Sequence, residues 1–274
     1  MHVETLRIYP LKSTSGIDLD ESVVEAGGLR HDRRWMVVDA DGETLTARTR
    51  RRLLHVTATP IDDDGITLSA PGAAPLVVNR PTGEPDVQLT ISRLESGVSA
   101  GRAADDWMSR HLQERVRVVW LDRPNRRTVG GAHGGRAGDA LSLADAGPLL
   151  LTTTKSLSQL NAWITQTATE RGAPDPTPLP MVRFRPNVVI EESPTAFIED
   201  EWKRLRIGEV ELRLGEHCDR CVLTTIDPVT LKGGKEPIRT LARQRHWDHH
   251  VYFGVRLIPV TLGVIRRGDR VALL

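Results

Sequence analysis

Short apolar runs broken by glycine and proline turns dominate the first hundred residues, and this pattern predicts strands rather than long helices. The strongest pair is residues 34–39 (RWMVVD) and 43–47, because the Asp41-Gly42 dipeptide between them is typical of a tight hairpin turn. Many short strands of this kind favour a β-barrel or a sandwich. The other strands are expected at residues 3–9, 53–59, 65–69, 76–79 and 87–91.

A helical period first occurs near residue 102, where Ala103, Trp107 and His111 recur at about the right spacing. A strand is expected directly after it, at residues 116–120. Residues 122–140 are rich in arginine and glycine, which predicts either a mobile surface loop or a flap over an active site.

A second unit of strands and helices begins around Pro148, where Thr153 is expected to cap a helix that runs through Ile164. The chain is therefore predicted to be mainly β with some helices (α+β), in two domains at residues 1–100 and 101–274. The remaining elements expected are strands at 149–151 and 188–190, a proline-rich loop at 174–180, a hairpin over 206–214 that turns at Gly208, a helix at 237–245, and closing strands at 252–258 and 263–274 paired around Gly268-Asp269.

Composition narrows the function classes. The chain has 37 Lys and Arg against 36 Asp and Glu, and this balance argues against general binding to nucleic acid or to a membrane surface. No signal peptide and no long apolar run are present, so a cytoplasmic protein with no membrane association is expected. Two cysteines are too few for a disulfide scaffold or for an iron–sulfur cluster held within the chain.

Both cysteines fall in one motif, residues 217–221 (HCDRC), for which three interpretations compete. A redox pair would need a helix after the motif, and the apolar, β-branched residues 222–225 do not predict one. A structural zinc site would need more ligands, such as the histidines of residues 246–250. The third interpretation is a single thiolate that binds a soft or high-valent metal, with Arg220 helping to hold the thiolate at Cys221.

Basic residues stand directly before or after several apolar strands. Lys12 and Ser13 follow the first strand, Arg33 leads into the run at 34–39, and Arg185 leads into that at 188–190. Only five of the basic residues are lysines, so composition explains many of the arginines. Arginines at a barrel rim are different, because their guanidinium groups suit phosphate. The sequence therefore predicts a phosphorylated ligand.

The order of these motifs resembles the family in which a MOSC domain, the C-terminal domain of molybdenum cofactor sulfurase, follows an N-terminal β-barrel domain. That family includes the amidoxime-reducing components and their bacterial relatives. The resemblance implies a small β-barrel-like domain at residues 1–100 and a MOSC β-barrel domain at 101–274. It rests on residues 9–13 (YPLKS), 29–35 (LRHDRRW), 183–187 (RFRPN), 218–228 (CDRCVLTTIDP), 235–237 (KEP) and 268–269 (GD).

The resemblance implies a molybdenum cofactor, a pterin dithiolene that carries molybdenum and a terminal phosphate. Cys221 matches the metal ligand and is the predicted catalytic residue. Thr153 is carried over as well, because backbone amides at a helix start favour an anion. Cys218 is expected to be a structural neighbour of the site. The other positions that match the cofactor site are Lys12, Ser13, Arg33, Arg185, Asn187, Asp219 and Arg220.

Three further features keep two interpretations each. Asp227 is either a proton donor at the metal or the cap of a turn at Pro228, and His217 shares this ambiguity. The segment 246–250 (HWDHH) either shapes a substrate pocket or is a solvated loop.

The function implied by the resemblance is the reduction of N-hydroxylated small molecules such as amidoximes, hydroxylamines and N-hydroxylated bases. An external electron donor (a reductase, a ferredoxin or a cytochrome) is implied, because some bacterial relatives carry an additional iron–sulfur domain for which this chain has no cysteines. The membrane anchor of the mitochondrial members is also not expected here.

Two other functions remain open at this point. The chain could carry sulfur or the molybdenum cofactor itself on Cys221, or it could be a catalytically silent module that binds another phosphorylated ligand. Pyridoxal phosphate is not expected, because none of the five lysines lies in a recognisable Schiff-base motif.

Overall fold

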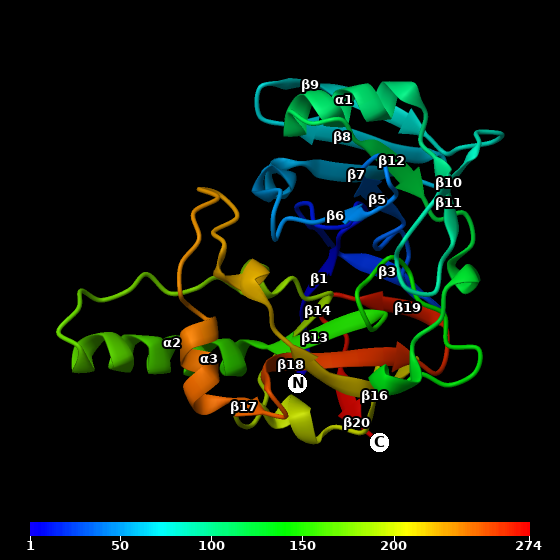
Figure 1. The fold of residues 1–274 in the computed structure, drawn as a ribbon. Helices are drawn as coiled ribbons and strands as arrows, with labels where there is room; N and C mark the ends of the chain where they lie inside the picture. Colours follow the sequence, from blue (N-terminus) through cyan, green and yellow to red (C-terminus); the bar gives the residue numbers. More distant parts are fainter.

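The computed structural model covers residues 1–274 and arranges them in two lobes, one above the other in the view of Figure 1. The upper lobe holds a five-stranded sheet in the order β10-β11-β12-β5-β6 and a three-stranded sheet in the order β7-β8-β9. The bounds of these strands are β5 (Trp35–Val38), β6 (Thr44–Leu45), β7 (Thr57–Ile61), β8 (Gly65–Ala70), β9 (Ala73–Asn79), β10 (Asp86–Gln88), β11 (Ser96–Ser99) and β12 (Arg117–Trp120).

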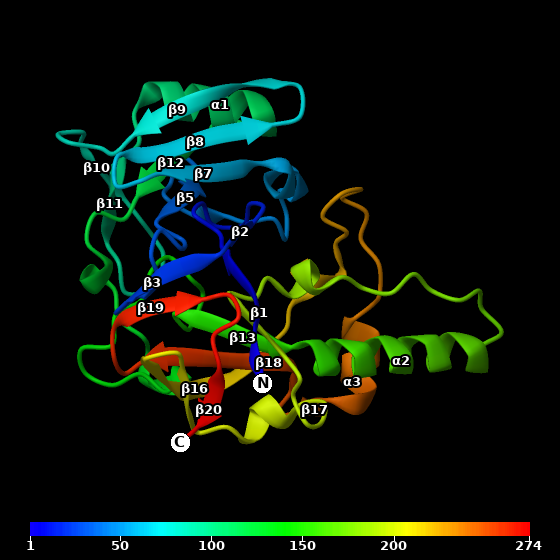
Figure 2. The same ribbon diagram turned by 180° about the vertical axis from the view of Figure 1, so that it is seen from behind.

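The lower lobe is built on a nine-stranded sheet in the order β2-β1-β14-β13-β18-β16-β15-β20, with β17 paired to β18. A three-stranded sheet, β19-β3-β4, lies between this sheet and the upper lobe (Figures 1 and 2). The bounds are β1 (His2–Ile8), β2 (Ile17–Leu19), β3 (Glu21–Glu25), β4 (Gly28–Leu29), β13 (Leu149–Thr153), β14 (Val188–Glu191), β15 (Arg204–Ile207), β16 (Val210–Asp219), β17 (His246–Trp247), β18 (His250–Pro259), β19 (Gly263–Arg266) and β20 (Val271–Leu273).

Three α-helices and six short 3-10 helices accompany the sheets, so the prediction of a mainly β, α+β protein is confirmed. The α-helices are α1 (Arg102–Leu112), α2 (Thr154–Glu170) and α3 (Ile238–Gln244). The 3-10 helices are η1 (Arg51–His55), η2 (Pro124–Arg126), η3 (Gly131–His133), η4 (Met181–Phe184), η5 (Ile198–Glu201) and η6 (Val222–Thr225).

Each lobe has its own apolar core. In the upper lobe, α1 buries Ala104, Trp107 and Met108 in one cluster with residues of η1 and β8, as its helical period predicts. In the lower lobe, β13, β14 and the long strand β18 contribute the centre of a second cluster. The connection from β13 to the parallel strand β14 passes through α2, which is the usual way to join parallel strands.

The chain passes between the lobes more than once. Strand β1 pairs with β14, and β3 pairs with β19, so the first thirty residues belong to the lower sheets. Helix α1 and strand β12 instead pack in the upper lobe, where β12 pairs with β5. The predicted division at residue 100 is therefore not where the packing changes.

The local turn signals are confirmed. The Asp41-Gly42 hairpin joins β5 to β6, and the turn at Gly208 joins β15 to β16. The strand predicted over 53–59 is partly wrong, because η1 occupies its first half and β7 begins only at Thr57. A short apolar run fits a buried helical turn as well as a strand, and here Leu53 and Leu54 are both buried by one turn.

The predicted pairing of the last strands with each other is wrong. Gly268 and Asp269 do form a turn, but β19 pairs with β3 and β20 pairs with β15. The turn itself is hydrogen-bonded to Val3, whose N–H donates to the Asp269 carbonyl over 2.9 Å. Long-range pairing with the start of the chain thus replaces the local hairpin.

Candidate functional site

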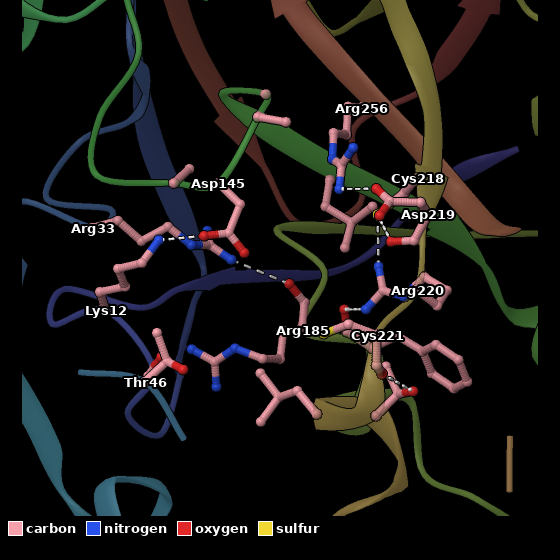
Figure 3. Close-up of a pocket in the computed structure, with 18 of the residues that line it drawn as sticks. Lys12, Arg33, Thr46, Asp145, Arg185, Cys218, Asp219, Arg220, Cys221 and Arg256 are labelled. Atoms are coloured by element: carbon pink, nitrogen blue, oxygen red, sulfur yellow. Dashed lines mark hydrogen bonds and ion pairs between the residues drawn. The ribbon is translucent and has the colours of Figure 1, made fainter. Parts of the chain in front are cut away.

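A cavity lies where the two lobes meet, and residues of both lobes line it (Figure 3). The structure brings eight of the nine predicted site residues to this cavity, and Thr153 is the exception. The eight are Lys12, Ser13, Arg33, Arg185, Asn187, Asp219, Arg220 and Cys221. Sequence reasoning missed other residues that line it, among them Thr46, Arg48, His133, Asp145 and Arg256.

Three of the lining residues have unusual backbone geometry. Ser13, Arg33 and Arg185 adopt φ values of 69°, 50° and 57°, in the left-handed region that non-glycine residues rarely adopt. Each residue stands in a connection just before or after a strand of the core. Strained backbone of this kind persists only where the surrounding structure holds it, and it is often concentrated at functional sites.

Lys12 is buried and anchored by the loop before β13. Its Nζ donates to the Leu143 carbonyl over 2.7 Å and forms an ion pair with Asp145. Burial lowers the pKa of Lys12, whereas Lys12 and the neighbouring Arg48 hold the pKa of the Asp145 carboxyl well below its usual value. The Asp145 carboxylate thus holds the side chains of Lys12 and Arg48 in place at the cavity. No motif signals it, because its partners are far away in the sequence.

Arg33 is oriented by two buried neighbours. Its Nη1 forms an ion pair with Asp32, and it donates to Asn187 Oδ1 over 3.1 Å. Burial opposes the charge of Arg33, but the Asp32 carboxylate raises its pKa. Asn187 also accepts from the Leu150 N–H and donates to the Arg7 carbonyl. Its amide is therefore engaged by the protein and positions Arg33.

Arg185 is a half-buried arginine of the cavity and has no carboxylate partner. Its Nη1 donates to the Thr14 carbonyl over 2.7 Å, and its guanidinium carbon lies 4.1 Å from the centre of the Tyr9 ring. Burial lowers the pKa of Arg185 to about 10. A partly desolvated cation without a counter-ion attracts an opposite charge, so the cavity favours an incoming anion at Arg185.

The two cysteines have different surroundings, and the predicted partner of Arg220 is wrong. Arg220 Nη1 donates to Cys218 Sγ over 2.7 Å, not to Cys221. Cys218 is only 3% exposed at the end of β16. Arg256, on β18, donates to Asp219 over 2.7 Å and forms an ion pair with Glu216. Burial would lower the pKa of Arg256, but Cys218, Glu216 and Asp219 together raise it.

Cys221 is partly exposed and has a partner from the other lobe. Arg48 Nε donates to Cys221 Sγ over 3.3 Å, and Arg48 Nη2 donates to Asp145 over 2.8 Å. The expectation that no helix follows the motif is wrong, because the short helix η6 begins directly after Cys221. The Cys221 side chain caps none of its N–H groups and stays available to the cavity.

The lining residues give the cavity a positive charge. Six Lys or Arg side chains line it, against the two carboxylates of Asp145 and Asp219. Figure 3 shows Lys12, Arg33 and Asp145 on one side, facing the group around Cys218 and Cys221 on the other. The arrangement can bind an anionic group at one end and offer a soft sulfur ligand at the other.

Thr153 does not join this site, which corrects its assignment. It caps α2 as predicted, because its Oγ1 accepts the Ser156 N–H over 3.1 Å. Its hydroxyl is also within 3.3 Å of a buried carboxylate, Glu199, which accepts from Ser156 Oγ over 2.9 Å. The residue is fully buried in this network. The helix start is therefore closed to a ligand of the cavity.

Replacing Glu199 with glutamine is expected to change the pH dependence of stability. Burial raises the pKa of Glu199, and one of its oxygens has no hydrogen-bond partner. A carboxyl whose pKa is raised by folding makes its full contribution to stability below its unfolded pKa of about 4.3. That contribution is lost as the pH rises through the folded pKa. Glu199→Gln should therefore gain stability relative to wild type between pH 4 and pH 7 in urea denaturation. The exposed Glu201→Gln is the control, and an equal, pH-independent effect of both variants would contradict this prediction.

The remaining sequence candidates lie outside the cavity. Asp227 caps its turn, since its Oδ1 accepts the N–H groups of Val229 and Thr230, and it pairs with Arg183. His217 contacts the Asp200 carbonyl through Nε2. Residues 246–250 form the β17–β18 hairpin. No group of three or more His, Cys, Asp or Glu side chains is arranged to hold a metal ion.

The arginine- and glycine-rich segment 122–140 is more than a surface loop. Arg127 is 2% exposed and donates to the carbonyls of Ser92, Ser142 and Ala144. The contacts with Ser142 and Ala144 fix the backbone just before Asp145. Arg127 has no carboxylate partner, and burial lowers its pKa to about 10. His133, at the end of η3, lines the cavity, as the alternative of an active-site flap requires.

Comparison with known proteins decides the family. Residues 1–115 match the family described as the MOSC N-terminal beta barrel domain, and residues 138–272 match the MOSC domain. The chain belongs to the MOSC domain family. The resemblance predicted from the sequence motifs is thereby confirmed, and both MOSC units contribute residues to the cavity.

Three similar proteins each match nearly the whole length of this MOSC protein. Mitochondrial amidoxime-reducing component 1 of Mus musculus is 34% identical over 99% of this chain and 82% of its own length. The protein of the same name from Homo sapiens is 33% identical over 99% and 82%. Among solved structures, the YuaD protein of Bacillus subtilis covers 98% of this chain and 92% of its own, with 11% identity and a TM-score of 0.39. No helix of this chain combines the length and hydrophobicity needed to cross a membrane.

Proposed function

We propose that this chain binds a molybdenum cofactor and reduces N-hydroxylated compounds, such as amidoximes, hydroxylamines and N-hydroxylated bases, with electrons from an external donor. The observation that carries the proposal is the cavity, which is lined both by the partly exposed sulfur of Cys221 and by the half-buried Arg185, an arginine without a carboxylate partner. The names of the relatives from Mus musculus and Homo sapiens support the substrate class.

The residues of the cavity fit such a cofactor. Arg185 lacks a counter-ion that the terminal phosphate would supply, and Lys12 and Arg33 lie at the same end. A thiolate is a ligand suited to molybdenum, and the Cys221 side chain is not used to cap η6. Arg220 adds a buried Nε without a hydrogen-bond partner. These groups would hold the two ends of the cofactor.

The protein's own residues would orient and shield the reacting centre. When bound, the cofactor would supply the two-electron chemistry that breaks the N–O bond, and the overall reaction consumes two electrons and two protons and releases water. Arg48 holds Cys221 Sγ through Nε and is itself held by Asp145. The Arg256–Asp219 pair lines the same end and presents a donor and an acceptor to a polar substrate.

The experiment that tests the proposal is expression in cells that make the cofactor, followed by measurement of molybdenum and pterin per chain. We expect both in amounts close to that of the protein, and turnover of benzamidoxime with reduced methyl viologen as electron donor. Absence of molybdenum and pterin would rule out the cofactor. Loaded protein without turnover would instead favour the carrier of sulfur or cofactor.

A further inference from the structure

We propose that the electron donor docks on a basic patch beside Cys221, and that this donor is a small acidic electron-transfer protein. The basic patch consists of Arg51 and Arg52 on η1 and of Lys232 and Lys235 on the loop that also carries the exposed Val229. This inference rests on the proposed function, because only a protein that reduces its substrate with outside electrons needs such a partner.

The basic patch is built from both lobes and held in place by hydrogen bonds. The loop from η6 to α3, residues 226–237, lies beside η1 in both views (Figures 1 and 2). Arg51 Nη1 donates to the Leu231 carbonyl over 3.1 Å, and His55 Nε2 lies 2.8 Å from the Val229 carbonyl. Ile226, at the base of the loop, is buried in the upper-lobe core. The two segments that carry the four cations are thus held against each other.

The charge of the basic patch is not neutralised locally. All four of its cations are exposed, and none takes part in an ion pair. The nearby carboxylates are already used, since Glu114 pairs with Arg50, Asp227 with Arg183 and Glu236 with Arg239. A local excess of positive charge on a protein of net charge +1 favours a negatively charged partner and speeds its association.

An exposed apolar side chain lies on the same loop as Lys232 and Lys235. Val229 is 78% exposed, the largest exposed fraction among the exposed large hydrophobic side chains, and Val222, directly after Cys221, is 54% exposed. An apolar centre with a charged rim is the usual anatomy of a transient protein interface. A small anion or a polyanion has no use for an exposed valine, which favours a protein as the occupant.

The position of the basic patch suits electron transfer to the cavity. The N–H of Gly234 donates to the Thr225 carbonyl over 3.0 Å, so the loop starts and ends beside the last residue of η6. Thr225 lies four residues after Cys221, which at the rise of a 3-10 helix is about 8 Å. From the upper lobe, Arg48 contacts Cys221 Sγ three residues before Arg51. Electron tunnelling weakens exponentially with distance, so a donor docked here has a short path.

The test uses the cofactor-loaded chain, benzamidoxime and two electron donors. One donor is a plant-type [2Fe–2S] ferredoxin, an acidic protein, kept reduced by its reductase, and the other is reduced methyl viologen. The patch variant is Arg52→Glu with Lys232→Glu, whose side chains make no hydrogen bonds within the chain. The matched control is Lys203→Glu with Arg206→Glu, two exposed cations of the lower lobe that are also in no ion pair.

We expect the ferredoxin-driven kcat/KM of the patch variant to fall at least about tenfold, since complementary surface charge sets association rates. The viologen-driven rate and both rates of the control variant should change less than twofold. Higher salt should slow only the ferredoxin-driven reaction of the wild type. Equal loss in both variants, or ferredoxin that drives no turnover while viologen does, overturns the docking surface. Failure of viologen itself to drive the wild type counts against the proposed function instead.

Discussion

Cys221→Ser is expected to cut the molybdenum retained per chain at least about tenfold, the scale on which changes at a metal site lower affinity. Cys221 offers a partly exposed sulfur to the cavity, and its only side-chain partner is Arg48. A serine hydroxyl is a much weaker acid than a thiol, and its oxygen is a harder ligand than sulfur, so serine does not replace a thiolate at a soft site. Molybdenum and pterin contents of the purified variant, expressed as the wild type is, give the measurement.

Cys218→Ser is the matched control, because it removes the other sulfur of the same motif. Cys218 is 3% exposed and accepts a hydrogen bond from Arg220, a contact that a serine oxygen can accept as well. Its molybdenum content should therefore fall by less than the roughly tenfold that loss of a hydrogen-bonding partner of a metal site costs. If Cys218→Ser loses more molybdenum than Cys221→Ser, the metal ligand is Cys218 and not Cys221.

Arg185→Gln is expected to weaken retention of the cofactor by roughly ten- to a hundredfold, because a hydrogen bond to a charged group is worth about 1.5–3 kcal/mol. The half-buried guanidinium has no carboxylate partner, so its charge is free for a phosphate. Dialysis of the loaded protein, followed by pterin and metal analysis, measures the loss. Arg185→Lys should recover part of the affinity, since a point charge is kept but the guanidinium fork is not.

Arg183→Gln controls for the loss of a nearby arginine. Arg183 lies two residues earlier but pairs with Asp227 and does not line the cavity. Retention of cofactor should be unchanged in this variant. If Arg183→Gln and Arg185→Gln release the cofactor equally, the effect comes from the fold of the 183–187 segment, and Arg185 has no special role as an anion partner.

The sequence by itself determined what depends on neighbours along the chain. The Asp41-Gly42 turn, the helical period of α1 and the cap of α2 at Thr153 are local, and each is found where it was predicted. The cavity residues that precede strands were also predictable, because a motif of a few residues carries both the strand and its basic neighbour. Order along the chain was enough to indicate the MOSC family, which the comparisons confirm.

Only the tertiary structure decided which side chains meet. Asp145 pairs with Lys12 across 133 residues and with Arg48 across 97, and Arg48 reaches Cys221 across 173. No local pattern encodes such contacts, because they depend on how the two lobes pack. The same holds for Thr153, whose local signal of an anion site is cancelled by its burial beside Glu199. Local propensity sets the elements, whereas burial and long-range charge pairing set the chemistry of the site.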